Sequence, residues 1–325
     1  MGSSDRFAPS RMTATFHPFS TAVCRSRRAL MACVLATFGS ACFDDDPLPV
    51  AAPANPAGYG PPPAAYSASG AAALVATGGA CDPAAASWSP GALPGLVVWL
   101  DAEDAPQGYV QAWRDRSPAA NDARQPVPAY QPMRANGAIG GYPAVRFDGR
   151  RALLEIADAP SLEWAFDDYA ILVVARFSVD RGTTFQMLYQ KVATTAPWDG
   201  PSLYVNGAKP TQATTVTAQM SQYAFATSAH DRLDDAPHVF VSRRVGAALE
   251  VRVDGAPEGA TVLATPIDVS APRRPVQIGQ NGDHRPGFQA LEGDVAEVVA
   301  VRGILPDDQL RVLECYLTVK YSRGP

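Results

Sequence analysis

Two glutamates near the C-terminal end of the chain have the spacing of a candidate acid–base pair. Glu292 and Glu297 bracket the segment 292–297, EGDVAE. Retaining enzymes that cleave glycosidic bonds use two carboxyl groups about 5–5.5 Å apart. On a regular strand, side chains five residues apart point to opposite faces, so this pair needs a β-bulge to share one cleft. The segment and its apolar continuation over 298–301 are also typical of a purely structural strand.

Aromatic side chains in expected loops are candidates for sugar binding, because the face of a sugar ring stacks on an aromatic ring. Trp198, in the turn-like segment 197–200, is the strongest of these, and Tyr204 follows it in the chain. Tyr130, Tyr204 and Tyr223 have a weaker sequence context than Trp198. We therefore expect Trp198 and Tyr204 to contribute to any ligand site.

The segment 280–285, QNGDHR, is rich in oxygen and nitrogen donors. Asn281, Asp283 and His284 are candidates to bind sugar hydroxyl groups, and calcium is a candidate cofactor because it prefers oxygen ligands. Turn formation explains the same residues equally well. The chain has only four histidines, and no histidine or cysteine pair has zinc-ligand spacing, so no metal centre is predicted.

The N-terminus has the three parts of a secretory signal. Arg25, Arg27 and Arg28 precede an uncharged apolar stretch over 29–41, which is too short to span a bilayer. Small residues then lead directly to Cys42, which resembles the lipobox of bacterial lipoproteins. We expect residues 1–41 to be a signal peptide of the lipoprotein type and Cys42 to carry a lipid. A cleaved signal without a lipid is the alternative.

Residues 42–87 are expected to form a disordered tether rich in Pro, Ala and Gly. The stretch 47–81 carries no charge and cannot bury enough apolar surface to fold. The whole chain has a net charge of −5, and without residues 1–41 it keeps 22 basic against 31 acidic residues. Such an acidic product lacks the basic face of a nucleic-acid-binding protein.

Residues 88–325 are expected to fold as one all-β domain, because short apolar or alternating segments recur with a period of two. Turn signals such as Asp254-Gly255 separate them. The expected strands are 96–100, 144–147, 170–179, 185–192, 202–205, 222–227, 238–243, 248–253, 276–279 and 294–301.

One helix is expected at the C-terminus. Pro306 suits a helix start, and the acidic residues that follow it complement the positive end of the helix dipole. Leu310, Leu313 and Leu317 then recur at helical spacing and form one apolar face, and Lys320 lies in the last turn. The helix is expected to pack across the sandwich.

Six sequence blocks identify a known fold by resemblance. They are 93–102 (LPGLVVWLDA), 113–123 (WRDRS with NDA), 143–149 (PAVRFDG), 249–255 (LEVRVDG), 293–298 (GDVAEV) and 316–321 (YLTVKY). In this order and spacing they resemble a laminin-G-like (LamG) domain of the concanavalin A-like lectin/glucanase superfamily. The resemblance implies a jelly-roll sandwich of two antiparallel sheets. It implies much less about activity, because the superfamily includes sugar-binding modules, adhesion domains and glycoside hydrolases.

The cysteines that remain after signal removal suggest one disulfide. Cys24 and Cys33 lie in the signal, and Cys42 is the lipid candidate. Cys81 and Cys315 are then left in an oxidising compartment, where two thiols tend to form a bridge. The alternative for Cys315 is a buried free thiol.

These observations predict a bacterial cell-envelope lipoprotein, anchored by its lipid and facing the periplasm or the exterior. Its jelly-roll domain is expected to bind a glycan or a cell-surface protein without catalysis. The alternative is a glycoside hydrolase of the laminarinase type, whose Glu-x-Asp-x-x-Glu motif is similar to the segment with Glu292 and Glu297.

Overall fold

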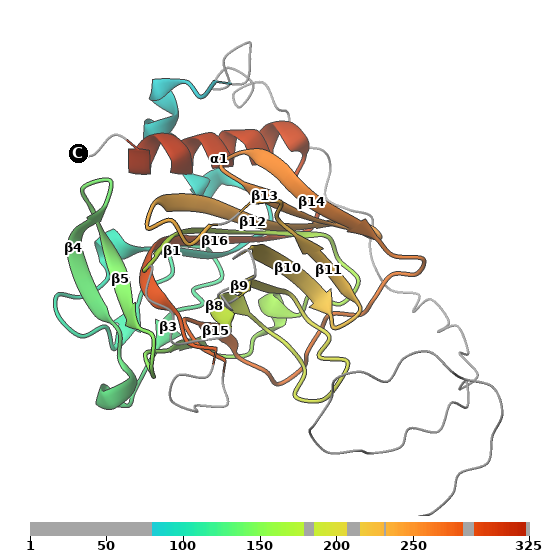
Figure 1. The fold of residues 1–325 in the computed structure, drawn as a ribbon, viewed down its shortest axis with the longest axis horizontal. Helices are drawn as coiled ribbons and strands as arrows, with labels where there is room; N and C mark the ends of the chain where they lie inside the picture. The colour runs from blue at the N-terminus through green and yellow to red at the C-terminus, as the bar shows by residue number, and fades with distance from the viewer. Residues whose placement is uncertain (1–79, 179–184, 207–214, 231, 282–288, 323–325) are drawn as a thin grey trace, which may run out of the picture. The chain divides into compact units, whose positions relative to one another are not determined.

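Two β-sheets and one C-terminal helix make up the described part of the chain (Figure 1). The structure is a computed structural model that describes residues 80–178, 185–206, 215–230, 232–281 and 289–322. All strand pairings within these ranges are antiparallel. The prediction of an all-β fold with two antiparallel sheets and a C-terminal helix is confirmed.

The first sheet is built around β16, its longest strand. In spatial order its strands are β14 (Ala256–Val262), β13 (Ala248–Val253), β12 (Pro237–Val245), β7 (Tyr169–Phe177), β16 (Glu292–Arg302), β5 (Tyr142–Asp148) and β4 (Met133–Ile139). On the edge of β16 away from β7, β5 pairs with its first half and β1 (Leu96–Asp101) with its second half.

The second sheet lies against one face of the first. Its strands, in spatial order, are β11 (Ala224–Thr227), β10 (Val216–Ser221), β9 (Ser202–Asn206), β8 (Phe185–Gln190), β15 (Val276–Ile278), β6 (Leu154–Ile156), β3 (Ala123–Arg124) and β2 (Ala112–Trp113). Short 3-10 helices lie in the connections, at η2 (Pro83–Ser87), η3 (Pro90–Ala92), η4 (Ala102–Asp104), η5 (Pro128–Tyr130) and η6 (Pro160–Leu162).

Where strand prediction and structure differ, the strands are short or interrupted. The expected strand 222–227 begins in the turn between β10 and β11, and only its last four residues, Ala224–Thr227, are extended. The sequence analysis also missed β2, β3, β4, β6, β10 and β14. Two- or three-residue strands such as β2 and β6 are too short to show a period of two, because alternation needs at least four residues.

Strand β7 shows why the sheet needs cover on both faces. Ile171, Val173 and Ala175 point into the core between the sheets. Leu172 and Val174 point to the other face, where they join a second apolar cluster with residues of the C-terminal helix. A strand with apolar side chains on both faces is stable only when both faces are buried.

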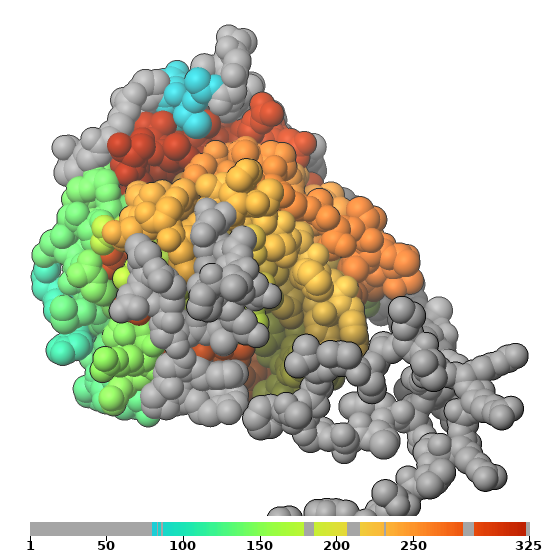
Figure 2. All heavy atoms as spheres, viewed as in Figure 1, coloured from blue at the N-terminus to red at the C-terminus, as the bar shows by residue number. Residues whose placement is uncertain are grey.

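Helix α1 (Asp307–Ser322) supplies the second cover. Leu310, Leu313 and Leu317 pack on the first sheet as their spacing predicts, and the Leu310 N–H closes the first turn on the Pro306 carbonyl. In the space-filling view the helix and the residues around η2 form the outermost layer here (Figure 2). In the described ranges, no helix is long and apolar enough to cross a membrane.

A buried ion cluster lies between α1 and the sheet. The Lys320 ammonium group donates to Asp101 Oδ2 (2.7 Å) and Glu297 Oε2 (2.9 Å). Tyr321 also donates to Glu297 Oε2, at 2.8 Å. Burial by itself lowers the pKa of a lysine, but the charges of Glu297 and Asp101 outweigh it and raise the pKa of Lys320 above its ordinary value. Lys320 therefore holds the end of the helix to β1 and β16 as a charged group.

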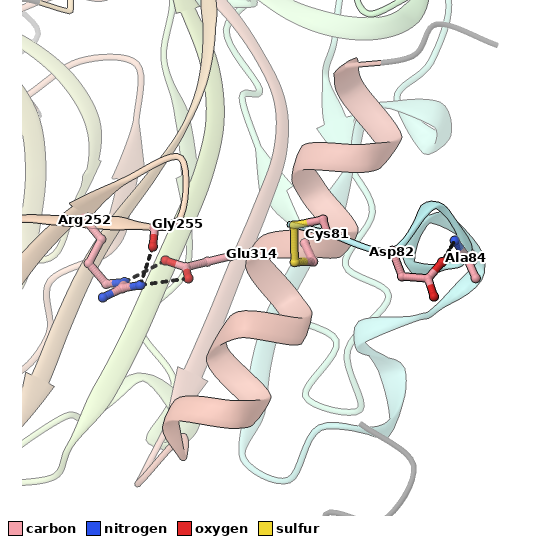
Figure 3. Close-up of a disulfide and its surroundings, with 7 residues drawn as sticks. Cys81, Asp82, Ala84, Arg252, Gly255 and Glu314 are labelled. Atoms are coloured by element: carbon pink, nitrogen blue, oxygen red, sulfur yellow. Dashed lines mark hydrogen bonds and ion pairs between the residues drawn. A yellow bond between two sulfur atoms is a disulfide. The ribbon is translucent and has the colours of Figure 1, made fainter. Parts of the chain in front are cut away.

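The disulfide between Cys81 and Cys315 joins the N-terminal end of the described chain to α1 (Figure 3). Ala85 of η2 and Val319 of α1 pack around it. Glu314 and Cys315 lie in the same turn of α1 and point to opposite sides of the helix (Figure 3). On the side of Glu314, Arg252 Nε of β13 donates to Glu314 Oε1 at 2.7 Å. The predicted Cys81–Cys315 bridge is confirmed, and η2 lies within the range assigned to the tether.

Replacing both Cys81 and Cys315 by Ser should lower the free energy of unfolding by about 2–5 kcal/mol. The bridge closes most of the folded chain into one loop, and losing it frees the unfolded state. Urea unfolding followed by tryptophan fluorescence measures the change. The double variant should be insensitive to reductant, whereas the unaltered protein should lose stability in it. Equal unfolding midpoints for the double variant and the unaltered protein, both without reductant, would contradict a structural bridge.

His238 on β12 sits between two carboxylates. Its Nδ1 lies 2.7 Å from Asp254 Oδ2 and its Nε2 lies 3.1 Å from Asp234 Oδ1. Burial lowers the pKa of the ring, but hydrogen bonds and charges of Asp254 and Asp234 outweigh it and raise the pKa of His238 above its ordinary value. The protonated ring thus ties the start of β12 to the β13–β14 turn.

This contact predicts a pH-dependent stability. Because the folded-state pKa of His238 is raised, its contribution is fully present below the unfolded pKa of about 6.5. It is lost as the pH rises through the folded-state pKa. Urea unfolding across that range should show a falling free energy for the unaltered protein. In His238→Gln, which cannot titrate, this part of the slope should vanish, and an identical pH profile would refute the assignment.

Candidate functional site

The outer face of the second sheet carries a transverse row of mostly polar side chains. Directly paired residues in a sheet have side chains on the same face. From β11 to β3 the row is Phe225, Gln219, Ser202, Gln190, Gln277, Glu155 and Arg124. Gln190 Nε2 donates to Gln277 Oε1 (2.8 Å), and Gln277 Nε2 donates to Glu155 Oε1 (2.9 Å). The middle of the row is buried, and its two ends are open.

Four aromatic residues lie on the strands, loop and turn next to the β11 end of this row, and we call them the aromatic patch: Trp198, Tyr204, Tyr223 and Phe225. The exposed fractions are 45% for Trp198, 78% for Tyr223 and 54% for Phe225. Phe225 pairs with Gln219, whose Oε1 accepts a hydrogen bond of 2.9 Å from the Tyr204 hydroxyl. Tyr204 and Phe225 therefore flank the Gln219 amide, and Trp198 and Tyr223 lie in the neighbouring loop and turn.

The loop between β8 and β9 brings Trp198 to this patch. It is closed by a hydrogen bond from Lys191 N to Pro201 O (2.9 Å). Gly200 has a φ of +140°, and a Cβ there would collide with the Lys191 carbonyl, so only glycine fits. The Gln222 N–H then donates to Pro197 O (2.9 Å), which places the loop against the β10–β11 turn.

Tyr204 is held rigidly as a neutral donor. Its ring contacts Phe185 edge-on, with ring centres 5.5 Å apart. Burial raises the pKa of the Tyr204 hydroxyl to about 12, so the group stays protonated at neutral pH. Because the hydroxyl donates to the Gln219 amide oxygen, it fixes the orientation of the amide.

Of the five predicted ligand residues, Tyr204 bonds the Gln219 amide and Trp198 lies in the loop that contacts the β10–β11 turn. Asn281 follows β15, and its Nδ2 donates to Gln289 Oε1 at 2.5 Å. Asp283 and His284 lie outside the described residues, as does Cys42. Among the residues that are described, no three acidic, histidine or cysteine side chains converge on a point that could hold a metal ion.

Phe225 and Gln219 were missed by sequence reasoning. The signal for Phe225 was present, because it alternates with Ala224 and Ala226, which are buried. An exposed phenylalanine between two inward alanines indicates an outward-facing ring. Gln219 had no such signal, because β10 itself was not predicted.

The acid–base pair of Glu292 and Glu297 is not formed. A β-bulge does lie between Val295 and Glu297, as the pairing would require. However, Glu297 is only 1% exposed and lies beneath α1, where Trp99, Tyr316, Lys320 and Tyr321 bond its carboxylate. Glu292 lines a separate cleft of about 610 Å³ at the start of β16. The two carboxylates therefore do not flank one bond, because the helix occupies the space next to Glu297.

Comparison with known proteins supports the fold and not a family. No protein-family model matches the chain, and no curated protein matches it. Among solved structures, the binding domain of Paraclostridial Mosquitocidal Protein 1 is similar, with 9% identity and a TM-score of 0.51, over 68% of this chain and 52% of that one. The chain thus spans about half the length of that protein. This likeness supports the two-sheet β-sandwich fold.

Two further structures have lower similarity. Trypanosoma rangeli sialidase in complex with the inhibitor DANA has 15% identity and a TM-score of 0.48, over 71% of this chain and 34% of that one. Domain 4 of AbnA, a GH43 extracellular arabinanase from Geobacillus stearothermophilus in complex with arabinotriose, has 13% identity and a TM-score of 0.45. It is matched over 67% of this chain and 98% of that one.

The burial of Glu297 predicts a structural role for it. Glu297→Gln should lower the free energy of unfolding by about 1–3 kcal/mol, because it removes a charge from the buried Lys320 contact. Glu292→Gln, at the border of an open cleft, should change it by about 0.5 kcal/mol or less. Urea unfolding of both variants checks this. Equal losses would contradict the difference in burial.

Proposed function

We propose that the chain is a cell-envelope lipoprotein whose jelly-roll domain binds a carbohydrate, without catalysis, at the aromatic patch. The observation that carries this proposal is the exposed ring of Phe225 beside the Gln219 amide, with the exposed Trp198 and Tyr223 in the adjoining loop and turn. A cell-surface protein is the second class of ligand for the same patch. The six laminin-G-like sequence blocks and the sandwich fold support a jelly-roll domain of this type.

The chemistry of the patch suits a sugar. A sugar ring has an apolar face of C–H groups and a rim of hydroxyl groups. Trp198 and Phe225 offer apolar ring surface to the face, and Gln219 offers amide donors to the rim. Large exposed aromatic side chains gathered at one place mark an interaction site, because isolated ones are the usual case on a surface.

The proposed location rests on the N-terminal sequence and on the disulfide. The basic residues, the apolar stretch 29–41 and Cys42 favour export and lipid attachment. The Cys81–Cys315 bridge supports an oxidising compartment, because such bridges are rare in the cytosol. The stretch 47–80 between the lipid and the bridge would then hold the domain away from the membrane.

Removing the rings of the patch should weaken binding. On an array of bacterial and plant cell-wall polysaccharides, Trp198→Ala and Phe225→Ala should each weaken binding about two- to tenfold, since one stacked ring contributes roughly 0.5–1.5 kcal/mol. Phe166→Ala is the matched control, because Phe166 is similarly exposed, at 44%, and lies outside the patch. A complete lack of polysaccharide binding, or unchanged binding in the double variant, would overturn the carbohydrate proposal.

Lipid attachment predicts the behaviour of Cys42→Ser. Expressed with its own N-terminus in a bacterial host, the unaltered protein should incorporate labelled fatty acid and sediment with membranes. The Cys42→Ser variant should lose the label and move to the soluble fraction, because a lipid is its only proposed anchor. Cys33→Ser, within the signal, is the control. Label retained in Cys42→Ser would show that the lipid is elsewhere.

A further inference from the structure

The cleft of about 610 Å³ lies on the outer face of the first sheet, a different sheet from that of the aromatic patch. Its floor is a transverse row of the register, Met133, Arg146, Asp294 and Arg176, on β4, β5, β16 and β7. Asp148 and Glu292 pair in the next row. All these side chains share the face that α1 covers further along the same strands.

The floor is rigid because its charged groups bind one another. Asp294 is buried, and its Oδ1 accepts from Arg146 Nε at 2.7 Å while its Oδ2 accepts from Arg176 Nη2 at 2.5 Å. Arg146 uses only two of its nitrogen atoms in this contact, Nε and Nη2. Half of the Arg146 side chain is exposed and it lines the cleft, so its remaining N–H groups are available to a ligand there.

One wall of the cleft is apolar. Tyr109 is 65% exposed and lines the cleft together with Met133 and residues of the segment 128–132. An aromatic ring beside planar donor and acceptor groups is an arrangement that fits a ring with an apolar face and a polar rim. The volume is within the range of about 300–1,000 Å³ typical of small-molecule sites.

The charges of the cleft select among ligands. Two guanidinium groups lie at the centre of the floor, and four carboxylates line the cleft: Asp148, Asp235, Glu292 and Asp294. The excess of negative charge opposes an anion. The central guanidinium groups oppose a cation. Hydroxyl groups both donate and accept, so they suit guanidinium and carboxylate groups alike.

We propose that this cleft is a second binding site, which takes an uncharged polyhydroxyl ligand, a neutral sugar residue. The domain then carries ligand sites on the outer faces of both sheets. This site uses none of the residues of the aromatic patch, so it stands or falls independently of the function proposed for that patch.

Nuclear magnetic resonance on the purified protein tests the site directly. The probes are methyl glucoside, glucosamine and glucuronate, which share one ring and are neutral, cationic and anionic. Methyl glucoside should shift the Met133 methyl and Arg146 Nε–H resonances with millimolar affinity, and glucuronate should bind at least about tenfold more weakly. Absence of any shift up to about 50 mM of each probe, or tightest binding of glucuronate, would overturn the proposal.

Substitutions at the wall and at the charged border test the residues assigned to this site. Tyr109→Ala should weaken methyl glucoside binding about five- to tenfold, because it removes the ring of the wall. The double variant Asp148→Asn with Asp235→Asn should strengthen glucuronate binding several-fold, because it removes two negative charges. The asparagine side chain of Asp148→Asn keeps an oxygen for the three backbone N–H groups whose hydrogen bonds Asp148 Oδ1 accepts.

The control is Trp198→Ala, which should leave the shifts of Met133 and Arg146 unchanged. A loss of these shifts in Trp198→Ala would mean that one shared site, and not two, binds the sugar. Unchanged affinity in Tyr109→Ala would equally refute the cleft as the binding site.

Discussion

The burial of β16 on both faces is the constraint on which the rest of the structure depends. Val298 and Ala300 face the second sheet, and Val299 and Val301 face the helix. A central strand that is apolar on both faces needs two covers. The second sheet provides one, and α1 provides the other. The disulfide to Cys315, the Arg252–Glu314 pair and the Lys320 cluster all serve to hold α1 in this place.

The extent of α1 decides where the first sheet is open. From Ala296 onward β16 lies under the helix, and Glu297 is drawn into the buried ion cluster. At Asp294 and Glu292 the helix no longer covers the strand, and the same face becomes charged and forms the cleft. The segment 292–297 therefore contains Glu297, which stabilises the fold, and Glu292 and Asp294, which line the cleft. The two glutamates resemble a catalytic motif in the sequence, but they lie in different environments along the strand.

The second sheet uses its outer face differently. The amide and carboxylate side chains of Gln190, Gln277 and Glu155 bind one another across three strands, which satisfies their polar groups where they are buried. At the β11 end the row finishes at Phe225, whose aromatic ring is exposed. The polar row thus stabilises the face, and Tyr204, which lies outside the row, orients Gln219 at its β11 end.

The sequence by itself determined the fold class, the C-terminal helix, the disulfide pair and the choice of Trp198 and Tyr204 as surface candidates. These follow from local signals: alternation, helix-end residues, cysteine number and turn chemistry. Only the tertiary structure decided which side chains share a surface. Phe225 and Gln219 join Tyr204, and Glu297 is separated from Glu292, because register across strands and the placement of α1 depend on contacts between residues far apart in the chain. Contacts of this kind produce no local pattern of residue spacing, so they could not be predicted from the sequence.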